Sequence, residues 1–273
     1  MFRIAAFGDE IDNNIEEQAR VFNEEGIKYL ELRVWNDTTL IDLSLDEWKR
    51  MKDVIEGNNL SIAAIASPIG KVFISDDFDE HFAAFKKYVD AAKFFGTDMI
   101  RVFSYYLPQD CPPEEFSDEV IARMKKKAEC AAENGITLIM ENERWLFGNI
   151  GRRCRQILES VGSPSLRLAF DPQNFLAEGE MPFAQNFEML ADYIAHVHIK
   201  DGKLNEPDTF VYAGMGDGQV RELLTALKDR DFDGFLSIEP HLGIFGGADK
   251  EARIRVFREA HSALKNLLKE IGG

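Results

Sequence analysis

Four polar side chains each close a short apolar segment in the second half of the chain, where a buried charge is costly unless something binds it. They are Glu141, Asp171, His198 and Glu239. Three carboxylates and one imidazole make a hard, oxygen-rich ligand set that suits Mn²⁺ or Mg²⁺ and also admits Co²⁺ or Zn²⁺. Any one of them alone could be an exposed residue at a loop edge. Four in succession predict a site for one divalent metal ion, if the apolar segments are neighbouring parallel strands.

Short apolar segments alternate with helical patterns along the chain, and this alternation predicts the fold. Strands are expected to start near residues 3, 28, 61, 98, 136, 166, 194 and 234. Helices in the second half are expected near 150–161, 183–192, 218–230 and 249–270. Such alternation implies parallel strands with right-handed crossovers, and eight units are the number found in a TIM barrel. We therefore predict an α/β protein, a single-domain (β/α)8 TIM barrel over residues 1–273; the alternative is an open doubly wound sheet.

Helix boundaries agree with this alternation. Ser44 and Glu47 have the capping-box spacing at the start of one helix. Gly26, Gly96 and Gly135 each stand between a helical pattern and the next strand. Glycine readily takes the left-handed conformation that ends a helix, so these three positions are predicted helix ends.

The barrel fold would bring the four polar residues together. In a parallel barrel the carboxyl ends of all strands open onto one face, and that face carries the chemistry. Side chains alternate inward and outward along a strand. If the four terminal side chains point inward, they meet in one part of the barrel mouth.

The motifs around these residues resemble those of a known superfamily. They read Glu141-Asn142-Glu143, Asp171-Pro172-Gln173-Asn174, His198-Ile199-Lys200-Asp201 and Glu239-Pro240-His241, with a glycine-rich turn, Gly214-Met215-Gly216-Asp217-Gly218, before the helix near 218–230. The set is similar to the xylose isomerase-like TIM-barrel family, which contains sugar phosphate isomerases and epimerases, inosose dehydratase and the AP endonucleases of family 2. The resemblance covers essentially the whole chain. It implies that the four residues at the strand ends bind one divalent metal.

Two departures from that family bear on the activity. Family epimerases and the endonuclease usually carry histidine three residues after the ligand that matches Asp171, whereas this chain has Asn174. The endonuclease also needs histidines at the ends of earlier strands for a cluster of three metals. Those ends read Ser67-Pro68 and Ser104-Tyr105 here. An abasic-site endonuclease is therefore disfavoured.

Six residues at the expected mouth are candidates for binding a substrate. They are Arg33, Glu143, Trp145, Asn174, Lys200 and His241. Asn174 can hydrogen-bond a substrate hydroxyl. Lys200 should point inward and could stabilise a developing enolate oxygen; the alternative is a rim salt bridge with Asp201 or Glu143.

The other rim candidates also have alternative interpretations. Trp145, together with Phe147, could form an apolar wall over the substrate or could simply pack within its loop. His241 could bind substrate or remain an exposed loop histidine. Arg33 could contact substrate, and Gly246-Gly247 could offer backbone N–H groups to a phosphate or belong to an ordinary loop.

Four polar residues interrupt strands and are expected inside the barrel. Glu31, Arg101 and Arg167 each break an apolar strand and favour a buried ion network. His196 is expected to be a hydrogen-bonded interior histidine one layer below the predicted ligand at position 198.

Composition excludes several classes of partner. The 273 residues carry a net charge of −16, so extended contact with nucleic acid or an anionic membrane is disfavoured. No apolar run approaches the length of a membrane span, and the first residues lack the apolar core of a signal peptide. Three unclustered cysteines fit a reducing compartment. We expect a cytoplasmic protein with no nucleic-acid or membrane partner, and assembly into a homo-oligomer is compatible with the sequence.

These observations predict a divalent-metal-dependent isomerase or epimerase that acts on a small sugar or sugar-derived keto compound. Glu141 and Glu239 would stand on opposite sides of this carbohydrate substrate. One would remove the proton beside the carbonyl and the other would return it, through an enediolate. The alternatives are a sugar or inosose dehydratase, which eliminates a β-hydroxyl group, and a sugar-binding barrel without catalysis.

Overall fold

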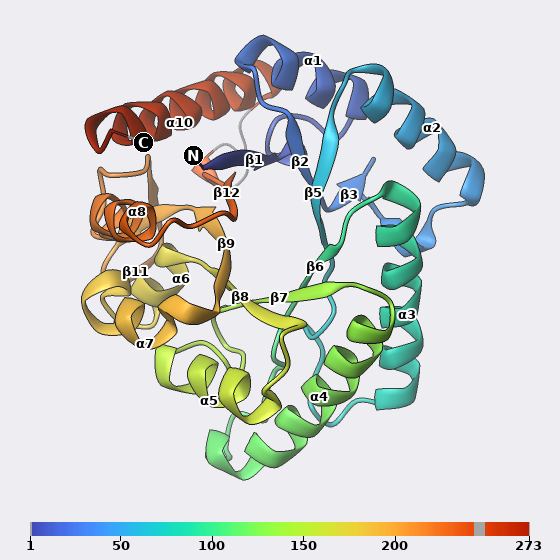
Figure 1. Cartoon of the computed structure of the whole chain (residues 1–273), viewed down its shortest axis with the longest axis vertical. Coiled ribbons are helices and arrows are strands. Elements are labelled where there is room, and N and C mark those ends of the chain that lie inside the picture. Colours follow the sequence, from blue (N-terminus) through green and yellow to red (C-terminus); the bar gives the residue numbers. More distant parts are fainter. Residues whose placement is uncertain (1, 243–248, 273) are drawn as a thin grey trace.

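The computed structural model describes residues 2–242 and 249–272 and contains a closed parallel barrel (Figure 1). Its eight strands are hydrogen-bonded to one another in chain order. They are β1 (Arg3–Phe7), β2 (Tyr29–Leu32), β5 (Ser61–Ala66), β6 (Met99–Val102), β7 (Thr137–Glu141), β8 (Leu166–Phe170), β9 (Ile194–Ile199) and β12 (Phe235–Ile238). Strand β12 pairs in parallel with β1 and closes the barrel. The predicted (β/α)8 TIM barrel is confirmed, and the open sheet is excluded.

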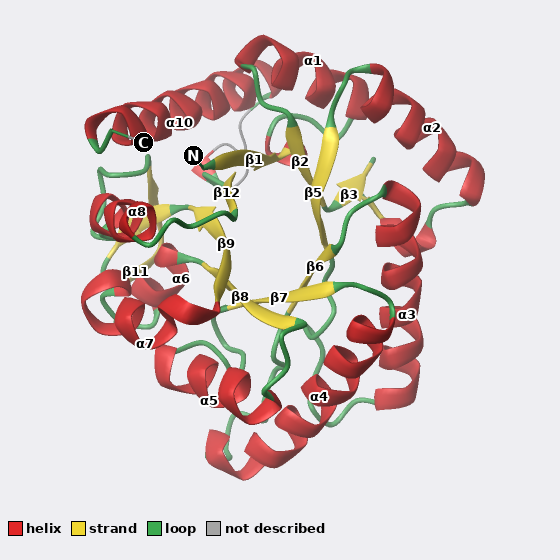
Figure 2. Cartoon of the chain, viewed as in Figure 1, coloured by secondary structure: helices red, strands yellow, loops and turns green. Residues whose placement is uncertain are grey.

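Helices surround the strands on the outside (Figure 2). The long ones are α1 (Ile15–Glu25), α2 (Leu45–Gly57), α3 (Phe78–Phe95), α4 (Ser117–Glu133), α5 (Gly151–Val161), α8 (Val220–Asp229) and α10 (Lys250–Glu270). Ser44 and Glu47 form a complete capping box at α2. Gly26 and Gly96 end α1 and α3 with φ values of 73° and 77°, as the sequence predicts.

The segment between β8 and β9 differs from the prediction of one helix near 183–192. It contains α6 (Pro172–Ala177), a π-helix (Pro182–Phe187), α7 (Glu188–Leu190) and a 3-10 turn (Ala191–Tyr193). Proline is favoured in the first helical turn, and Pro172 and Pro182 each begin a separate helical piece. Asp171 caps α6 by accepting the N–H of Asn174 at 3.0 Å. This helical turn places the Asn174 side chain beside Glu141, at the mouth of the barrel.

Two antiparallel hairpins add to the predicted elements on the mouth side of the barrel. One consists of β3 (Val34–Trp35) and β4 (Thr38–Thr39) and follows β2. Its two-residue loop, Asn36-Asp37, has positive φ at both positions, 49° and 60°, as a type I′ hairpin turn requires. The other consists of β10 (Asp201–Lys203) and β11 (Glu206–Val211) and follows β9 directly. Strands β3, β4 and β10 have only two or three residues. Strand β11 has the sequence EPDTFV, which contains a proline and no apolar run, so neither hairpin is marked in the sequence.

The barrel interior is apolar near the strand starts and charged near the strand ends. Phe235 is the first residue of its strand and packs with Ala5 and Ala63, beside Tyr29 and Met99. A second small cluster of buried apolar residues in the barrel consists of Ala64, Ile139 and Ala169. The polar residues Glu31, Arg101, His196 and His198 are buried in the same barrel. The large core lies between the strands and the surrounding helices.

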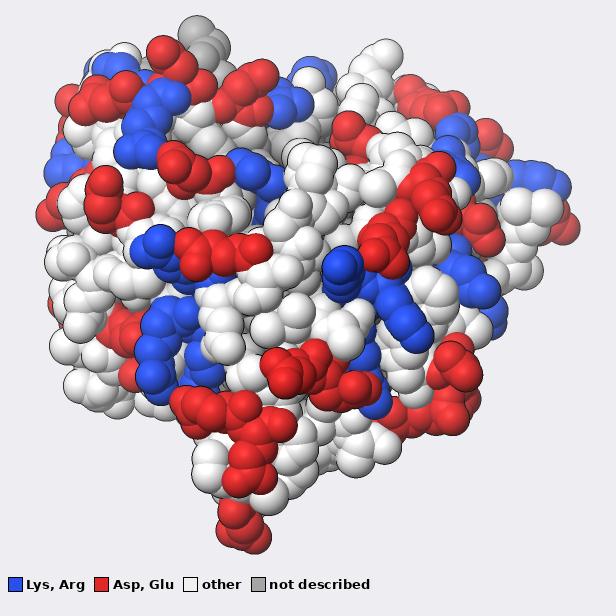
Figure 3. Space-filling view, turned by 60° about the horizontal axis from the view of Figure 1, so that its bottom comes forward, with Lys and Arg blue, Asp and Glu red and all other residues white. Residues whose placement is uncertain are grey.

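The surface carries charged side chains of both signs. On the face drawn in Figure 3, lysine and arginine side chains are interspersed with aspartate and glutamate rather than gathered into one extended basic area. Among the helices in residues 2–242 and 249–272, none combines the length and the apolar character needed to cross a membrane.

Candidate active site

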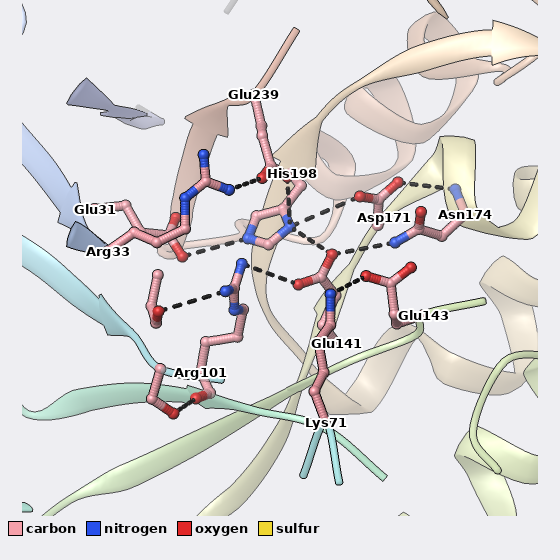
Figure 4. A network of polar contacts seen from close by, with 12 residues as sticks. Glu31, Arg33, Lys71, Arg101, Glu141, Glu143, Asp171, Asn174, His198 and Glu239 are labelled. Carbon is pink, nitrogen blue, oxygen red and sulfur yellow. Dashed lines mark hydrogen bonds and ion pairs between the residues drawn. The ribbon is translucent and has the colours of Figure 1, made fainter. Parts of the chain in front are cut away.

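The four side chains singled out as metal ligands meet at the mouth of the barrel (Figure 4). Glu141 ends β7, Asp171 caps α6, His198 lies in β9, and Glu239 follows β12. His198 Nδ1 lies 3.2 Å from Glu141 Oε1, 3.4 Å from Glu239 Oε2 and 3.7 Å from Asp171 Oδ2. All four residues are buried, so the barrel concentrates three carboxylates around one imidazole away from solvent.

This arrangement fits a divalent cation. The four residues each offer one ligand atom, and these atoms all lie within 4.8 Å of one another. Glu141 Oε2, Asp171 Oδ2 and His198 Nδ1 are buried without a hydrogen bond of good geometry. The charges of the two carboxylates are met by the cations Arg101 and Lys200, at 3.3 and 2.6 Å. The donor set of carboxylate oxygens and one imidazole nitrogen is one that Mn²⁺, Mg²⁺, Co²⁺ and Zn²⁺ accept.

Two other triplets of the described residues also bring three such atoms together, but their atoms are already engaged. In Glu31, His196 and His198, the carboxylate is bonded to both histidines. In Glu10, Glu239 and His241, the guanidinium of Arg33 lies 2.9 Å from Glu239 and 3.8 Å from Glu10. Glu10 also contacts His241 Nδ1 at 2.8 Å, so both carboxylates of this triplet already have partners.

Lys200 points inward and pairs with two of the candidate ligands. Its Nζ lies 2.6 Å from Asp171 Oδ2 and 3.2 Å from Glu239 Oε2. Burial alone would lower the pKa of Lys200, but the charges of Asp171 and Glu239 outweigh burial and raise this pKa above its ordinary value. The alternative of a rim salt bridge with Asp201 or Glu143 is wrong, because the Lys200 ammonium lies among the ligand carboxylates instead.

Asp201 has a different role, which explains the glycine-rich turn. Its carboxylate accepts backbone N–H groups from Gly202, Gly214, Gly216 and Gly218 at 2.8–3.0 Å. A Cβ atom on Gly216 would lie 2.2 Å from Asp201 Oδ1, so a larger residue could not approach the carboxylate in this way. The turn thus encloses an anion that the chain itself supplies.

A buried carboxylate behind the site holds the ligand histidine. Glu31 contacts His196 Nε2 at 2.8 Å and His198 Nε2 at 3.3 Å. Burial alone would raise the pKa of Glu31, but the two histidines outweigh it and lower this pKa well below its ordinary value. With Nε2 turned to Glu31, His198 presents Nδ1 to the carboxylates at the mouth. Glu31 therefore belongs to the predicted interior ion network, and His196 is the expected interior histidine.

Replacing Glu31 with glutamine is expected to weaken Mn²⁺ binding by about 10- to 100-fold, the usual cost of removing a carboxylate that orients a ligating histidine. Calorimetric titration of the metal-free protein with MnCl₂ measures the change. Glu25→Gln is the matched control, because Glu25 also pairs with a histidine, His261, at 2.8 Å, but between α1 and α10. An unchanged Kd in Glu31→Gln would contradict the positioning role.

Arginines hold the two candidate catalytic carboxylates. Arg101 Nη1 lies 3.3 Å from Glu141 Oε2, and Arg33 Nη1 lies 2.9 Å from Glu239 Oε1. Burial would raise the pKa of both carboxyls, but nearby cations outweigh it. They lower the pKa of Glu141 to about 2 and that of Glu239 well below its ordinary value. Arg33 is also bonded to Asp9 at 2.6 Å, so it positions Glu239 rather than standing free for substrate.

The remaining rim candidates surround the same opening. Asn174 Nδ2 donates to Glu141 Oε1 at 3.1 Å and to the Asn142 carbonyl at 2.9 Å. His241 contacts Glu10 at 2.8 Å and lies against the ring of Phe210. These contacts place both residues beside the candidate ligands.

Glu143 lies at the same opening and pairs with Lys71 at 2.7 Å. Trp145 is 69% exposed, with the Arg144 guanidinium over its ring. Trp145 therefore lies where a substrate could touch it.

The structure decides two further expectations. Phe147 is fully buried in the core, so it packs in its loop and does not form a wall over the substrate. Arg167 does not join the interior ion network; it donates to the carbonyl of Asp192 at an exposed position, because it lies near the start of β8 rather than its end. Gly246-Gly247 lies outside the described residues.

Two adjoining cavities open at this site. The first, of about 280 Å³, is lined by residues that include Arg33, Arg101, Glu141 and Glu239. The second, of about 170 Å³, is lined by residues that include Tyr106, Arg144, Trp145 and Asn174. Lys71, Glu143, Lys200 and His241 line both. The site can therefore hold a small molecule that extends from the carboxylates of the first cavity into the second.

Sequence reasoning missed Asp9, Glu10 and Lys71 at this site. Asp9 and Glu10 follow β1 just as the four candidate ligands follow or end their strands, so the same rule could have found them. Lys71 lies several residues beyond β5 in a loop, and no pattern in the sequence marks it as part of the mouth.

The chain belongs to the family described as xylose isomerase-like TIM barrel, which matches residues 19–267. Among curated relatives, 2-epi-5-epi-valiolone 7-phosphate 2-epimerase of Actinoplanes sp. is 40% identical over 78 residues, 28% of either chain. Fructoselysine 3-epimerase of Shigella flexneri is 25% identical over 154 residues, 55% of either chain. The matches thus span about a quarter and about half of the relatives' lengths. Both relatives are named as epimerases.

Solved structures agree on the fold. The crystal structure of the IOLI protein with a bound zinc atom superposes with a TM-score of 0.79 over 99% of both chains, at 18% identity. Such a low identity shows the fold alone.

Proposed function

We propose that this protein is a divalent-metal-dependent isomerase or epimerase of a small sugar or sugar-derived keto compound. One observation carries the proposal: Glu141 and Glu239 line the same cavity, each with one oxygen next to His198 and the other beside an arginine. Moving a proton from one face of a carbon to the other needs an acid–base group on each face, and two carboxylates in one cavity can supply both.

The proposed metal ligands are Glu141, Asp171, His198 and Glu239, holding one Mn²⁺, Mg²⁺, Co²⁺ or Zn²⁺ ion. A divalent cation bound there would polarise the substrate carbonyl and so lower the pKa of the carbon-bound proton beside it. The neighbouring family structure with zinc is consistent with this choice of cofactor.

The chain's own residues would carry the proton. A glutamate carboxyl is ionised at neutral pH, so either side chain can accept a proton. One glutamate removes the proton beside the carbonyl, and the other returns it. Return to the same carbon from the opposite face gives the epimer. Return to the neighbouring carbon, with the hydroxyl proton passing from one enediolate oxygen to the other, gives the isomer.

Neighbouring residues would support the charge that develops. The ammonium of Lys200 faces the same cavity and could stabilise the enediolate oxygen, as preorganised cations do in sites closed to water. Asn174 orients Glu141 through its hydrogen bond and could also bind a substrate hydroxyl. Glu143, His241 and Trp145 complete the proposed substrate-contacting set, and Arg33 acts through Glu239.

Exchange of substrate hydrogen with solvent tests the function. The Mn²⁺-loaded protein is incubated in D₂O with a panel of ketoses, keto acids and inososes, and products are followed by NMR. We expect deuterium at a carbon next to the carbonyl of at least one compound, and none after the metal is removed. Binding of a panel member without exchange would favour the sugar-binding barrel. Loss of a β-hydroxyl would identify a dehydratase.

Several parts of the sequence interpretation stay predictions. These are a single domain over residues 1–273, a cytoplasmic location, the lack of a nucleic-acid partner and of abasic-site endonuclease activity, and assembly into a homo-oligomer.

A further inference from the structure

The second cavity is lined by more positively than negatively charged side chains. Three cations line it, Lys71, Arg144 and Lys200, against one carboxylate, Glu143. This excess is unexpected in a chain whose net charge is −16. A cavity enriched in one sign of charge attracts ligands of the opposite sign.

The single carboxylate in this cavity is already satisfied. Glu143 Oε2 pairs with Lys71 at 2.7 Å, and Glu143 Oε1 accepts the backbone N–H of Arg144 at 2.9 Å. Glu143 therefore neutralises one cation and has little left to offer a positively charged ligand. Lys200 is engaged by the ligand carboxylates below.

Arg144 is the cation with the weakest partner. Within residues 2–242 and 249–272, its guanidinium bonds only to Asp208, at 3.3 Å, and the Asp208 side chain is 79% exposed. Exposed ion pairs contribute little and are screened by salt. The Arg144 guanidinium also lies 4.5 Å from the centre of the Trp145 ring. Stacking on an aromatic ring keeps the planar guanidinium oriented while its N–H groups remain available to bind an anion.

We propose that the substrate carries an anionic group, a phosphate or a carboxylate, at the end remote from its carbonyl, and that Arg144 binds this group with help from Lys71. The inference rests on the proposed function, because the carbonyl end must occupy the first cavity for the remote end to reach the second. A cavity of about 170 Å³ has the volume of about five or six water molecules in the liquid, which suits one small anionic group. Arginine matches both anions, since its planar fork can donate two parallel hydrogen bonds to either.

Binding of three ketones tests the inference: D-fructose, D-fructose 6-phosphate and 5-keto-D-gluconate. Calorimetric titrations use the Mn²⁺-loaded parent, Arg144→Gln, and the control Arg155→Gln, which alters an exposed arginine paired with Glu159 on α5. We expect at least one acidic ketone to bind about 10- to 100-fold more tightly than D-fructose, the range of a charge-assisted hydrogen-bond pair. That advantage should disappear in Arg144→Gln and persist in Arg155→Gln. Comparison of the two acidic ketones tells phosphate from carboxylate.

A second variant keeps the test decisive if Arg144→Gln does not fold. Asp208→Asn removes the exposed partner of Arg144 without touching the cation, so the acidic ketone should bind as tightly as to the parent or more tightly. Equal binding of D-fructose and both acidic ketones to the parent, or an acidic advantage that survives in Arg144→Gln, would overturn the inference. In Asp208→Asn, a loss of that advantage would do the same.

Exchange in D₂O separates this inference from the proposed function. Exchange into D-fructose at the rate seen for the acidic ketones would support the proposed isomerase and contradict an anionic substrate. An Arg144-dependent preference for acidic ketones, with no exchange into any of them, would support an anionic ligand and contradict the proposed isomerase.

Discussion

With metal bound, the Glu141→Gln and Glu239→Gln proteins are expected to lose solvent-deuterium exchange by about 10²- to 10⁴-fold, the usual contribution of a positioned general base. Glutamine keeps an oxygen where each carboxylate has one next to His198 but cannot accept the proton. Truncation to alanine would confound loss of the base with loss of the metal. The exchange rate in D₂O, followed by NMR on a compound that the parent protein turns over, measures the effect.

Two controls make this comparison specific. Metal content by elemental analysis must match the parent, so that the lost rate reflects the base. Glu159→Gln makes the same chemical change at an exposed carboxylate on α5, paired with Arg155 at 2.7 Å, and should exchange at the parent rate. If both metal-loaded active-site variants also exchange at the parent rate, the two-glutamate mechanism is wrong. The base would then have to be Glu143, Lys200 or His241.

The position of these glutamates could be predicted because a strong rule applies to parallel barrels. The carboxyl ends of all strands open onto one face of the barrel, so a carboxylate that follows an apolar strand is expected on that face. The same rule applied to β1 points to Asp9 and Glu10. The strict alternation of strand and helix likewise predicted the barrel. The short helical pieces after Asp171 were not predicted, because they depend on local proline and capping interactions rather than on a helical pattern of apolar residues.

The contacts among charged side chains could not be predicted in the same way. Arg33, Arg101 and Lys200 were each expected inside or at the mouth, yet which carboxylate each one meets depends on strand register and rotamers. Lys200 had two plausible directions from its place in the sequence. In the structure its ammonium lies beside Asp171 and Glu239, while Asp201 accepts four backbone N–H groups. Lys71 reaches Glu143 from a loop whose path no periodicity describes.

A lysine in the core gives a second large expected effect: Lys127→Met should raise the free energy of unfolding at pH 7 by about 2–4 kcal/mol, given the cost of burying an unpaired amine. Lys127 falls on the buried face of α4 beside Met124, Ala128 and Ala131. Its Nζ lies 4.5 Å from the centre of the Tyr105 ring and has no hydrogen-bond partner among the described residues. Burial, aided by the charge of Arg123, lowers the pKa of Lys127 to about 7.

The pH dependence distinguishes this cause from simple repacking. An unfolded lysine keeps its proton up to a pKa of about 10.4, whereas the folded protein releases it near pH 7. Between these values the unfolded chain binds more protons, so the parent gains stability as pH rises, and Lys127→Met lacks this gain. Urea unfolding from pH 7 to 10, with metal removed, should therefore show the advantage of Lys127→Met shrinking. Lys125→Met, an exposed site on the same helix, should stay within about 0.5 kcal/mol of the parent. A Lys127→Met protein that is less stable than the parent at pH 7, with an unchanged dependence of stability on pH, would contradict this prediction. It would mean that other contacts stabilise the buried amine.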